Sequence, residues 1–307
     1  MDCPAITNGV TVFTDGRIRP CCLTAAEYSK PLSCIQDPNR FTDLIHRDRP
    51  AACRACWQAE DNGIVSLRHY YKQKVIPDNT NIQFLDFRLS NQCNLKCRYC
   101  GPHFSNQWAK ELSIAQPLKQ VDVSEYHDDL FNENLTDLYW CGGEPLILKE
   151  HYEINKLLID KNLSKNISLR YNTNLTVLKY KDIDIIDIWK QFKDITLDVS
   201  LDAANDVVNY IRSGSDWQTI DKNINFILNS NIPNLKLRFT PVVSALNIWF
   251  LPELLSYAKS RNIPVMFYAL DNPDYLSLSV LPKELKEQAR QILESSNTHN
   301  DLSLIHI

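Results

Sequence analysis

The chain lacks any long hydrophobic run: its apolar segments are strand-sized and are interrupted by charged residues. A membrane-spanning helix needs about 20 consecutive apolar residues, so we predict neither a membrane span nor a membrane partner. The first residues, MDCPAITNGV, contain neither the basic region nor the hydrophobic region of a signal peptide. We therefore expect a cytoplasmic protein.

An excess of positive charge is also lacking. The 33 Lys and Arg residues face 37 Asp and Glu residues, for a formal net charge of −4. Proteins that bind nucleic acid neutralise phosphates with surplus basic side chains, so we expect no nucleic-acid partner. The apolar share of 44% and the charged share of 23% are typical of a globular protein. The length of 307 residues favours one large domain with a smaller one.

Cysteine, by contrast, is abundant and unevenly distributed. Of the ten cysteines, six precede residue 57, three lie within residues 93–100, and Cys141 is the last. In a reducing compartment, clustered cysteines are more often metal ligands or catalysts than disulfides. The sequence therefore predicts metal or redox chemistry in the first half of the chain.

From residue 82 onward, β-rich runs alternate with amphipathic helical segments, which predicts parallel βαβ units. The architecture expected is an open doubly wound sheet or part of a (β/α) barrel. In either, functional groups gather where strands end, and CNLKC, CGGEP and TNL follow the first three runs. The expected strands are 82–89, 135–140, 167–172, 195–201, 235–243 and 264–270, with helices within 151–163, 252–262 and 282–295.

Residues 1–80 differ in character, because they are rich in cysteine and in turn sequences. We expect a helix near 66–75 and a short linker at 75–81. So small a module is poorly stable without metal or another cross-link. The predicted organisation is a Cys-rich module (1–80), an α/β core (81–270) and a helical tail (271–307).

The stretch CNLKCRYC has the spacing C-x-x-x-C-x-x-C, with Tyr99 before the last cysteine. A structural zinc site typically adds a second cysteine pair nearby, and a ferredoxin supplies a fourth cysteine to its cluster. The stretch resembles the signature of the radical S-adenosylmethionine (AdoMet) enzymes. That resemblance implies a partial (β/α)6 TIM-type barrel and a 4Fe–4S cluster held by Cys93, Cys97 and Cys100. AdoMet would bind the iron that has no protein ligand, and Tyr99 would lie against its adenine.

Further motifs follow in the order that this family shows. WCGGEP (140–145) resembles its GGEP element, and NTN, SLD and YIRSG resemble later strand ends. The resemblance places the following residues around AdoMet: Gly142, Gly143, Glu144, Asn174, Ser200 and Arg212. Glu144 has the alternative of capping its own turn. Cys141 would be a catalytic hydrogen-atom donor to a substrate radical, or else a packed strand residue.

The N-terminal cysteines form the pattern C-x₁₂-G-x₄-C, from Cys3 to Cys21, followed by CRAC at 53–56. The pattern resembles the auxiliary-cluster element of the twitch and SPASM branches of the family, where it normally follows the barrel. It implies a second 4Fe–4S cluster on Cys3, Cys21, Cys53 and Cys56, with a four-cysteine zinc site as the alternative. Because adjacent strand residues face opposite ways, Cys21 and Cys22 are not expected to share one cluster, and the G-x₄-C spacing favours Cys21. Cys22 and Cys34 are expected to be buried small hydrophobes or spare thiols.

The function implied is that of a radical AdoMet enzyme of the oxidoreductase type. A one-electron donor such as flavodoxin or ferredoxin would drive cleavage of AdoMet to a 5′-deoxyadenosyl radical, which abstracts a hydrogen atom from substrate. The leading substrate class is a peptide or protein. The alternatives are dehydrogenation of a small metabolite and a non-catalytic iron–sulfur or zinc protein.

Overall fold

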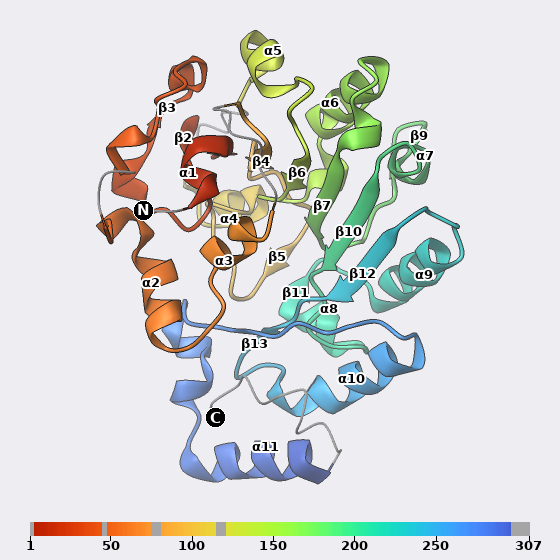
Figure 1. Ribbon diagram of the computed structural model, residues 1–307. Helices are drawn as coiled ribbons and strands as arrows, with labels where there is room; N and C mark the ends of the chain where they lie inside the picture. Colours follow the sequence, from red (N-terminus) through yellow and green to blue (C-terminus); the bar gives the residue numbers. More distant parts are fainter. Residues whose placement is uncertain (1–2, 45–47, 75–80, 115–120, 296–307) are drawn as a thin grey trace.

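The computed structural model describes residues 3–44, 48–74, 81–114 and 121–295. Its centre is an eight-stranded sheet with the order β12-β10-β7-β6-β4-β1-β2-β3 (Figure 1). The predicted α/β class is confirmed. The expected linker after residue 74 and the tail after residue 295 lie outside the described residues.

Five of the six predicted strands form a continuous parallel array. They are β4 (Phe84–Phe87), β6 (Asp137–Trp140), β7 (Ser168–Thr173), β10 (Asp194–Val199) and β12 (Leu235–Phe239). The sixth run is mostly irregular: β14 (Tyr268–Ala269) pairs with β13 (Val242–Val243), and a single bridge joins Val265 to Phe239. The array is therefore a parallel β/α barrel that remains open, as predicted.

The connecting helices have apolar faces of helical period. In α6 (Lys149–Asp160) the buried residues include Tyr152, Ile154 and Leu158, so one face packs on the sheet while the other meets solvent. The longer helices are α6, α9 (Trp217–Leu228), α10 (Leu251–Ser260) and α11 (Lys283–Ser295), and the shorter ones α4 (Asn106–Glu111), α5 (His127–Leu130), α7 (Ile185–Trp189) and α8 (Val207–Ile211). The helices predicted from periodicity are thus present.

The N-terminal segment extends the sheet of the core. Its elements are α1 (Pro4–Asn8), β1 (Gly9–Val12), β2 (Arg17–Arg19), β3 (Lys30–Pro31), α2 (Arg54–Asp61) and α3 (Leu67–Lys72). β1 runs parallel to β4, with Gly9 opposite Phe84 and Val12 opposite Phe87. Val10 and Val12 are buried in the same apolar cluster as the core strands. This pairing covers an edge of β4 that would otherwise be open, and the segment is continuous with the sheet.

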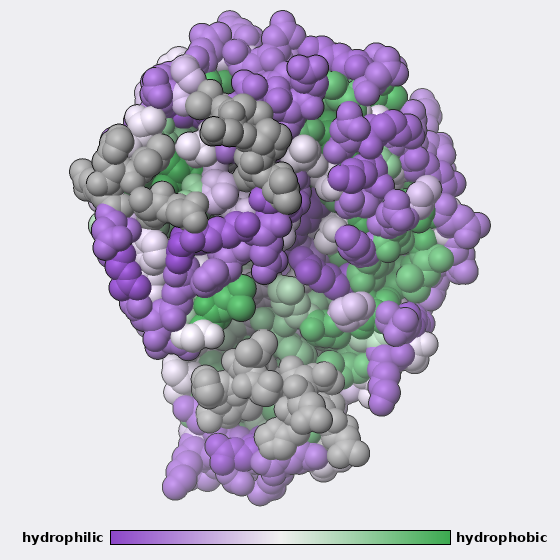
Figure 2. Space-filling model, viewed as in Figure 1, coloured by the Kyte–Doolittle hydropathy of each residue, from purple (hydrophilic) through white to green (hydrophobic). Residues whose placement is uncertain are grey.

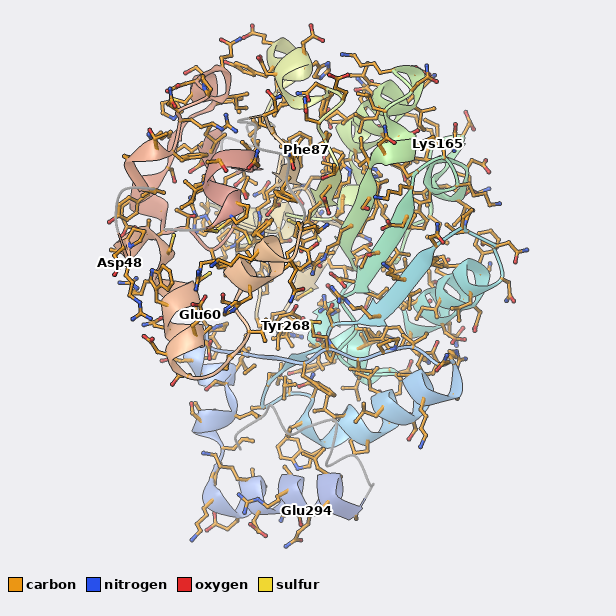
Figure 3. All side chains as sticks on the ribbon, viewed as in Figure 1. Asp48, Glu60, Phe87, Lys165, Tyr268 and Glu294 are labelled. Atoms are coloured by element: carbon orange, nitrogen blue, oxygen red, sulfur yellow. The ribbon has the colours of Figure 1, made fainter. Side chains whose placement is uncertain are left out.

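Phe87, at the end of β4, is fully buried and lies between the N-terminal segment and α6, in the upper part of Figure 3. Its ring packs against Phe131 and Trp140. The face shown in Figure 2 is mostly hydrophilic. None of the helices in the described ranges has the length and apolar character needed to cross a membrane.

Candidate functional site

The carboxyl ends of β4, β6, β7 and β10 surround a cavity of about 210 Å³, here called the cysteine pocket. Every residue that the resemblance assigned to the barrel site lines it: Cys93, Cys97, Tyr99, Cys100, Cys141, Gly142, Gly143, Glu144, Asn174, Ser200 and Arg212. These residues come from five separate stretches of the chain. Their convergence follows from the parallel strands, whose ends all meet at one edge of the sheet.

The loop of the three cysteines is held rigidly in place. Cys93 and Cys97 are buried and Cys100 is half-buried. The backbone N–H of Cys93 donates to Asn106 Oδ1 at 3.1 Å, and Trp108 Nε1 donates to the Cys97 carbonyl at 2.9 Å. Burial raises the pKa of the Cys93 thiol to about 12 and that of Cys97 to about 11. A metal that replaces the protons would offset this cost, since metal binding deprotonates thiols.

Arg212 is brought to this loop by backbone pairing. The short strand β11 (Arg212–Ser213) pairs with β5 (Lys96–Cys97), which sets Arg212 opposite Cys97. Its terminal nitrogen lies 3.7 Å from Cys97 Sγ, and its Nε lies 2.8 Å from Asp202 Oδ2. A guanidinium in this position favours a thiolate at Cys97.

Asp202 is a residue of the site that the sequence interpretation missed. It is fully buried, accepts a hydrogen bond of 2.7 Å from the Tyr99 hydroxyl, and accepts another of 2.9 Å from the Val242 N–H. Together with its ion pair to Arg212, these contacts make it the carboxylate that joins the cysteine loop to β10 and β13. A signal existed, because Asp202 closes the SLD stretch that contains Ser200.

The glycines of the GGEP turn are required by close packing. A Cβ on Gly143 would lie 2.1 Å from the Gln92 carbonyl oxygen, and Gly142 has φ +108°. The N–H groups of Gly143 and Glu144 donate to the carbonyls of Ser90 and Gln92, at 3.0 and 2.8 Å. The turn therefore packs directly against residues 90–92, which lead into Cys93.

Glu144 caps its own turn and also fixes the end of β7. Its carboxylate accepts from the Leu146 N–H at 3.1 Å, the Thr173 hydroxyl at 2.7 Å and the Asn174 N–H at 2.7 Å. Burial nevertheless raises its pKa from 4.5 to about 7. Of the two roles expected for Glu144, the capping role is therefore present.

Asn174 and Ser200 occupy neighbouring strand ends on the pocket wall. Asn174 Nδ2 donates to Asn94 Oδ1 at 3.0 Å, which ties β7 to the cysteine loop. The N–H of Ser200 donates to the Thr173 carbonyl at 2.9 Å. Both residues line the cysteine pocket, and Asn174 lies directly beside the GGEP turn through its hydrogen bond to Glu144.

Cys141 follows β6 directly and is buried. Its thiol donates to Asp86 Oδ1 at 3.1 Å, while Asp86 also accepts from the Arg88 guanidinium at 3.2 Å. Burial, followed by the negative charge of Asp86, raises the pKa of the Cys141 thiol well above its usual value. The sulfur therefore keeps its hydrogen at neutral pH.

The four N-terminal cysteines assigned by the resemblance also meet. Cys3, Cys21, Cys53 and Cys56 line one small cavity between α1, α2 and α3. Burial, and then the charge of the neighbouring thiols, raises the pKa of Cys3 and of Cys53 to about 12. Four thiols that line one cavity are the type of donor that suits either a cubane cluster or zinc.

Cys21 and Cys22 face different cavities, as expected, but they lie in a turn after β2 and not in a strand: the Thr24 N–H donates to the Cys21 carbonyl at 3.2 Å. Cys22 lines a neighbouring cavity of about 360 Å³, here called the central chamber. The chamber shares Tyr139 with the cysteine pocket, and it shares Pro20, Leu67 and Tyr71 with the N-terminal cysteine cavity. It thus lies between the two groups of thiols. Figure 2 shows this face of the molecule hollowed between the N-terminal segment and strands β10 and β12.

Three aromatic residues near the chamber differ in burial. Trp140 is buried in the apolar core, Tyr139 lines the chamber, and Tyr268 is 46% exposed. Strand alternation explains the difference between Tyr139 and Trp140, because neighbouring residues of β6 point to opposite faces of the sheet.

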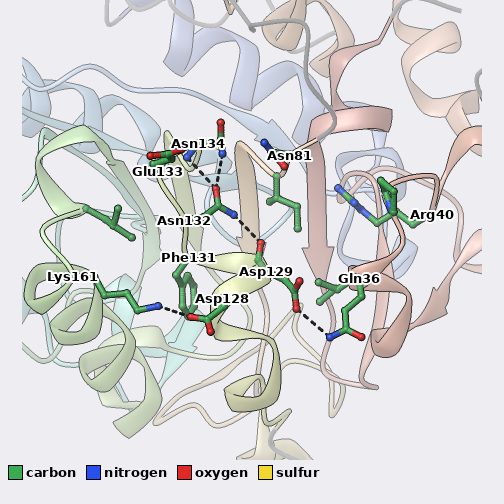
Figure 4. Close-up of a pocket in the computed structure, with 14 residues that line it drawn as sticks. Gln36, Arg40, Asn81, Asp128, Asp129, Phe131, Asn132, Glu133, Asn134 and Lys161 are labelled. Carbon is green, nitrogen blue, oxygen red and sulfur yellow. Dashed lines mark hydrogen bonds and ion pairs between the residues drawn. The ribbon is translucent and has the colours of Figure 1, made fainter.

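A larger pocket of about 660 Å³ lies near the amino ends of β4 and β6, away from the thiols (Figure 4). Its polar groups largely satisfy one another: Lys161 pairs with Asp128 at 2.8 Å, and Gln36 donates to Asp129 at 3.3 Å. It contains none of the predicted site residues. The chemistry of the chain is therefore concentrated at the other end of the sheet.

Within the described ranges, no group of three or more His, Cys, Asp or Glu side chains is arranged to hold a metal ion. The cysteines of each set line a common cavity, but their side chains are not arranged in metal-coordination geometry.

Comparison with known proteins places this geometry in a family. The model of the Radical SAM superfamily matches residues 87–258, which is more than half of the chain. The chain belongs to the radical SAM superfamily. Membership implies a 4Fe–4S cluster and AdoMet, which agrees with the three thiols and the GGEP turn around one pocket.

Curated relatives resemble the chain over part of their length. A GTP 3′,8-cyclase of Helicobacter pylori (strain ATCC 700392 / 26695) is 28% identical over 222 residues, covering 70% of this chain and 63% of the relative. A GTP 3′,8-cyclase of Nautilia profundicola is 23% identical over 190 residues, covering 61% of this chain and 55% of the relative. This chain thus spans less than two thirds of either relative. Streptococcus suis SuiB bound to S-adenosylmethionine matches with a TM-score of 0.45 and 16% identity, over 85% of this chain and 57% of SuiB.

Proposed function

We propose that this protein cleaves AdoMet reductively and uses the resulting radical to abstract a hydrogen atom from a substrate in the central chamber. The observation that carries the proposal is that three thiols, the GGEP turn and Arg212 line one pocket, which shares Tyr139 with a second cavity. In a member of the radical SAM superfamily, this arrangement supports an enzyme of the oxidoreductase type.

Cys93, Cys97 and Cys100 would hold the 4Fe–4S cluster as thiolates. When bound, the cluster supplies the electron that splits AdoMet into methionine and a 5′-deoxyadenosyl radical, after reduction by a donor such as flavodoxin or ferredoxin. Arg212, near Cys97 Sγ, lowers the cost of charge on this thiolate. Cys93 and Cys97 are buried, which limits the access of water to these two ligands.

The wall of the pocket would bind and orient AdoMet. Tyr99, Gly142, Gly143, Asn174, Ser200 and Arg212 are proposed to contact it, since they surround the space beside the thiols. Tyr99 is held in position by Asp202, and Glu144 acts by holding β7 and the GGEP turn together. Glu144 is therefore proposed as a positioning residue.

Cys141 is proposed as a hydrogen-atom donor at the substrate side of the pocket. Its thiol is protonated, and its residue lies between the cysteine pocket and Asp86, which lines the chamber. A donor in this position would return a hydrogen atom to a substrate radical. The alternative is a packing role only.

Cys3, Cys21, Cys53 and Cys56 are proposed to bind a second 4Fe–4S cluster, with zinc as the alternative. Four protein thiolates leave no iron open to substrate, so such a cluster would act by electron transfer. Its cavity adjoins the chamber through Tyr71 and Leu67, which suits exchange of an electron with a substrate radical. We further propose that the chain is organised as a Cys-rich module (1–80), a radical AdoMet core (81–270) and a helical tail (271–307).

Two substrate classes remain candidates. A peptide or protein is the class expected from the twitch and SPASM resemblance. A small anionic metabolite is the second candidate, because the curated relatives are named for a reaction of GTP. The chamber of about 360 Å³ accommodates a small molecule or one side chain of a peptide.

The first test is formation of 5′-deoxyadenosine by anaerobically reconstituted protein with dithionite and AdoMet. Wild-type protein should form it, and Cys97→Ala should lose the activity because one cluster ligand is missing. Cys34→Ala is the matched control, since Cys34 lies in neither thiol cavity. A Cys97→Ala protein as active as this control would refute the assignment.

A further inference from the structure

The central chamber has more basic than acidic groups, although the chain as a whole is acidic. A groove beside the chamber shares Arg170, Thr196 and Lys236 with it. In and around the chamber and this groove, the basic residues are Lys74, Arg88, Arg170, Lys193, Lys236 and Arg238. The acidic residues there are Asp86, Asp137, Asp194 and Asp198, the last of which pairs with two arginines. The formal charge of this region is therefore positive.

Most of the carboxylates are already engaged. Asp86 accepts from Arg88 and Cys141, Asp137 forms an ion pair with Lys74, and Asp194 accepts from the Ser168 hydroxyl at 2.8 Å. The positive charge left over consequently lies toward β7, β10 and β12.

At that side, one carboxylate serves two guanidinium groups. Asp198, which is fully buried, accepts from Arg170 Nε at 2.6 Å and from an Arg238 terminal nitrogen at 3.1 Å. The pairing fixes both arginines but neutralises only one of them. Arg170 is further held over the ring of Tyr139, 4.8 Å from its centroid.

Part of each arginine remains reachable from the cavity. The Arg170 and Arg238 side chains keep 31% and 27% of their surface exposed. Both line the groove that continues the chamber, together with Lys236 and Thr196. Within the part of the chain that the structure describes, Lys236 has no acidic partner.

The geometry points to an anion-binding subsite here: Arg170, Arg238 and Lys236 bind a carboxylate or phosphate group of the substrate. Pre-positioned guanidinium groups suit such planar or tetrahedral anions. The inference rests on the proposed function only in treating the bound anion as part of the substrate. With the anion at β7 and β12, the rest of the substrate extends past Tyr139 toward Cys141 and the cysteine pocket.

The test is calorimetric binding of three probes to anaerobically reconstituted, AdoMet-saturated protein: inorganic phosphate, succinate and triglutamate. At least one should bind, and Arg170→Gln and Lys236→Gln should each weaken binding about tenfold or more, the loss typical of a charge-assisted hydrogen bond. Arg170→Lys should retain part of the affinity because it keeps the charge. Lys165→Gln is the matched control, because Lys165 lies at the outer edge of the molecule (Figure 3).

The probes separate the sources of the anion. Binding of phosphate or succinate favours a small metabolite, whereas binding of triglutamate alone favours an acidic peptide; either supports the subsite. Circular dichroism must show that Lys236→Gln, a change at an exposed side chain, leaves the fold intact. The inference is overturned if no probe binds, or if the chamber variants bind as well as Lys165→Gln. Formation of 5′-deoxyadenosine without substrate, measured in parallel, reports the proposed function separately.

Discussion

His151 is a fully buried titratable side chain that packs behind β6 and β7. It is fully buried in α6, with its ring packed edge-on against Trp140, Tyr152 and Tyr171. Nε2 lies 2.9 Å from the Tyr171 hydroxyl, and Nδ1 has no hydrogen-bond partner among the described residues. Burial lowers the pKa of His151 from 6.5 to about 3.

This shift predicts acid sensitivity. Between pH 6.5 and 3 the unfolded chain binds a proton that the folded chain rejects, so the stability from neutral His151 is present above pH 6.5 and is lost as pH falls. The free energy of unfolding should drop by about 2 kcal/mol from pH 6.5 to pH 5 through this residue. His151→Phe should lack that part of the drop in urea unfolding, at a cost of about 1 kcal/mol at neutral pH for the lost hydrogen bond.

His103→Gln, at an exposed position, is the control for this prediction and should keep the wild-type dependence on pH. A His151→Phe protein that loses stability in acid as steeply as wild type would contradict the assignment.

At the scale of elements, the GGEP turn and the cysteine loop support each other through their backbones. Their contact leaves no room for a side chain at Gly143, whereas a Cβ on Gly101 would meet nothing within 4 Å. Gly101 directly follows Cys100, so both glycines lie at or beside the cysteine pocket. They differ in how closely their Cα atoms are packed.

Gly143→Ala should therefore destabilise the protein by about 3 kcal/mol or more, because backbone on both sides must move. Reconstituted Gly143→Ala should also hold less iron, since the loop before Cys93 is displaced. Gly101→Ala should remain close to wild type. Urea unfolding and iron analysis measure both effects, and equal behaviour of the two variants would show that the close contact is unimportant.

At the scale of the whole molecule, the central chamber shares lining residues with both thiol cavities. If the N-terminal cavity holds a second cluster, wild-type protein should contain about eight irons, and a variant lacking Cys53 and Cys56 about four. About four irons with one zinc per chain would assign the site to zinc instead.

Cys53→Ala should separate the two halves of the reaction. Formation of 5′-deoxyadenosine should continue because the cysteine pocket is intact, but product should be lost because no electron can be exchanged with the substrate radical. Circular dichroism must first show a native fold, since a metal site stabilises a small module. Full turnover by the folded variant would mean that the N-terminal site is structural.

Local pattern in the sequence determined much of this protein. Five core strands and the helices α3, α6, α10 and α11 follow from apolar periodicity, which is a property of neighbouring residues. The spacing of Cys93, Cys97 and Cys100 and the GGEP stretch indicated the family for the same reason. These signals are short in sequence, so they can be read without knowing which segments meet.

Tertiary structure decided the rest, because the decisive contacts join residues far apart in the chain. Only the pairing of β1 with β4 shows that the N-terminal segment continues the sheet, a contact across about 75 residues. The same holds for Arg212 beside Cys97, Asp202 beneath Tyr99, and the loop of Gln92 against Gly143. The charge of the central chamber arises from alternate residues of strands that the sequence separates by helices, and no local pattern records which of those side chains share a cavity.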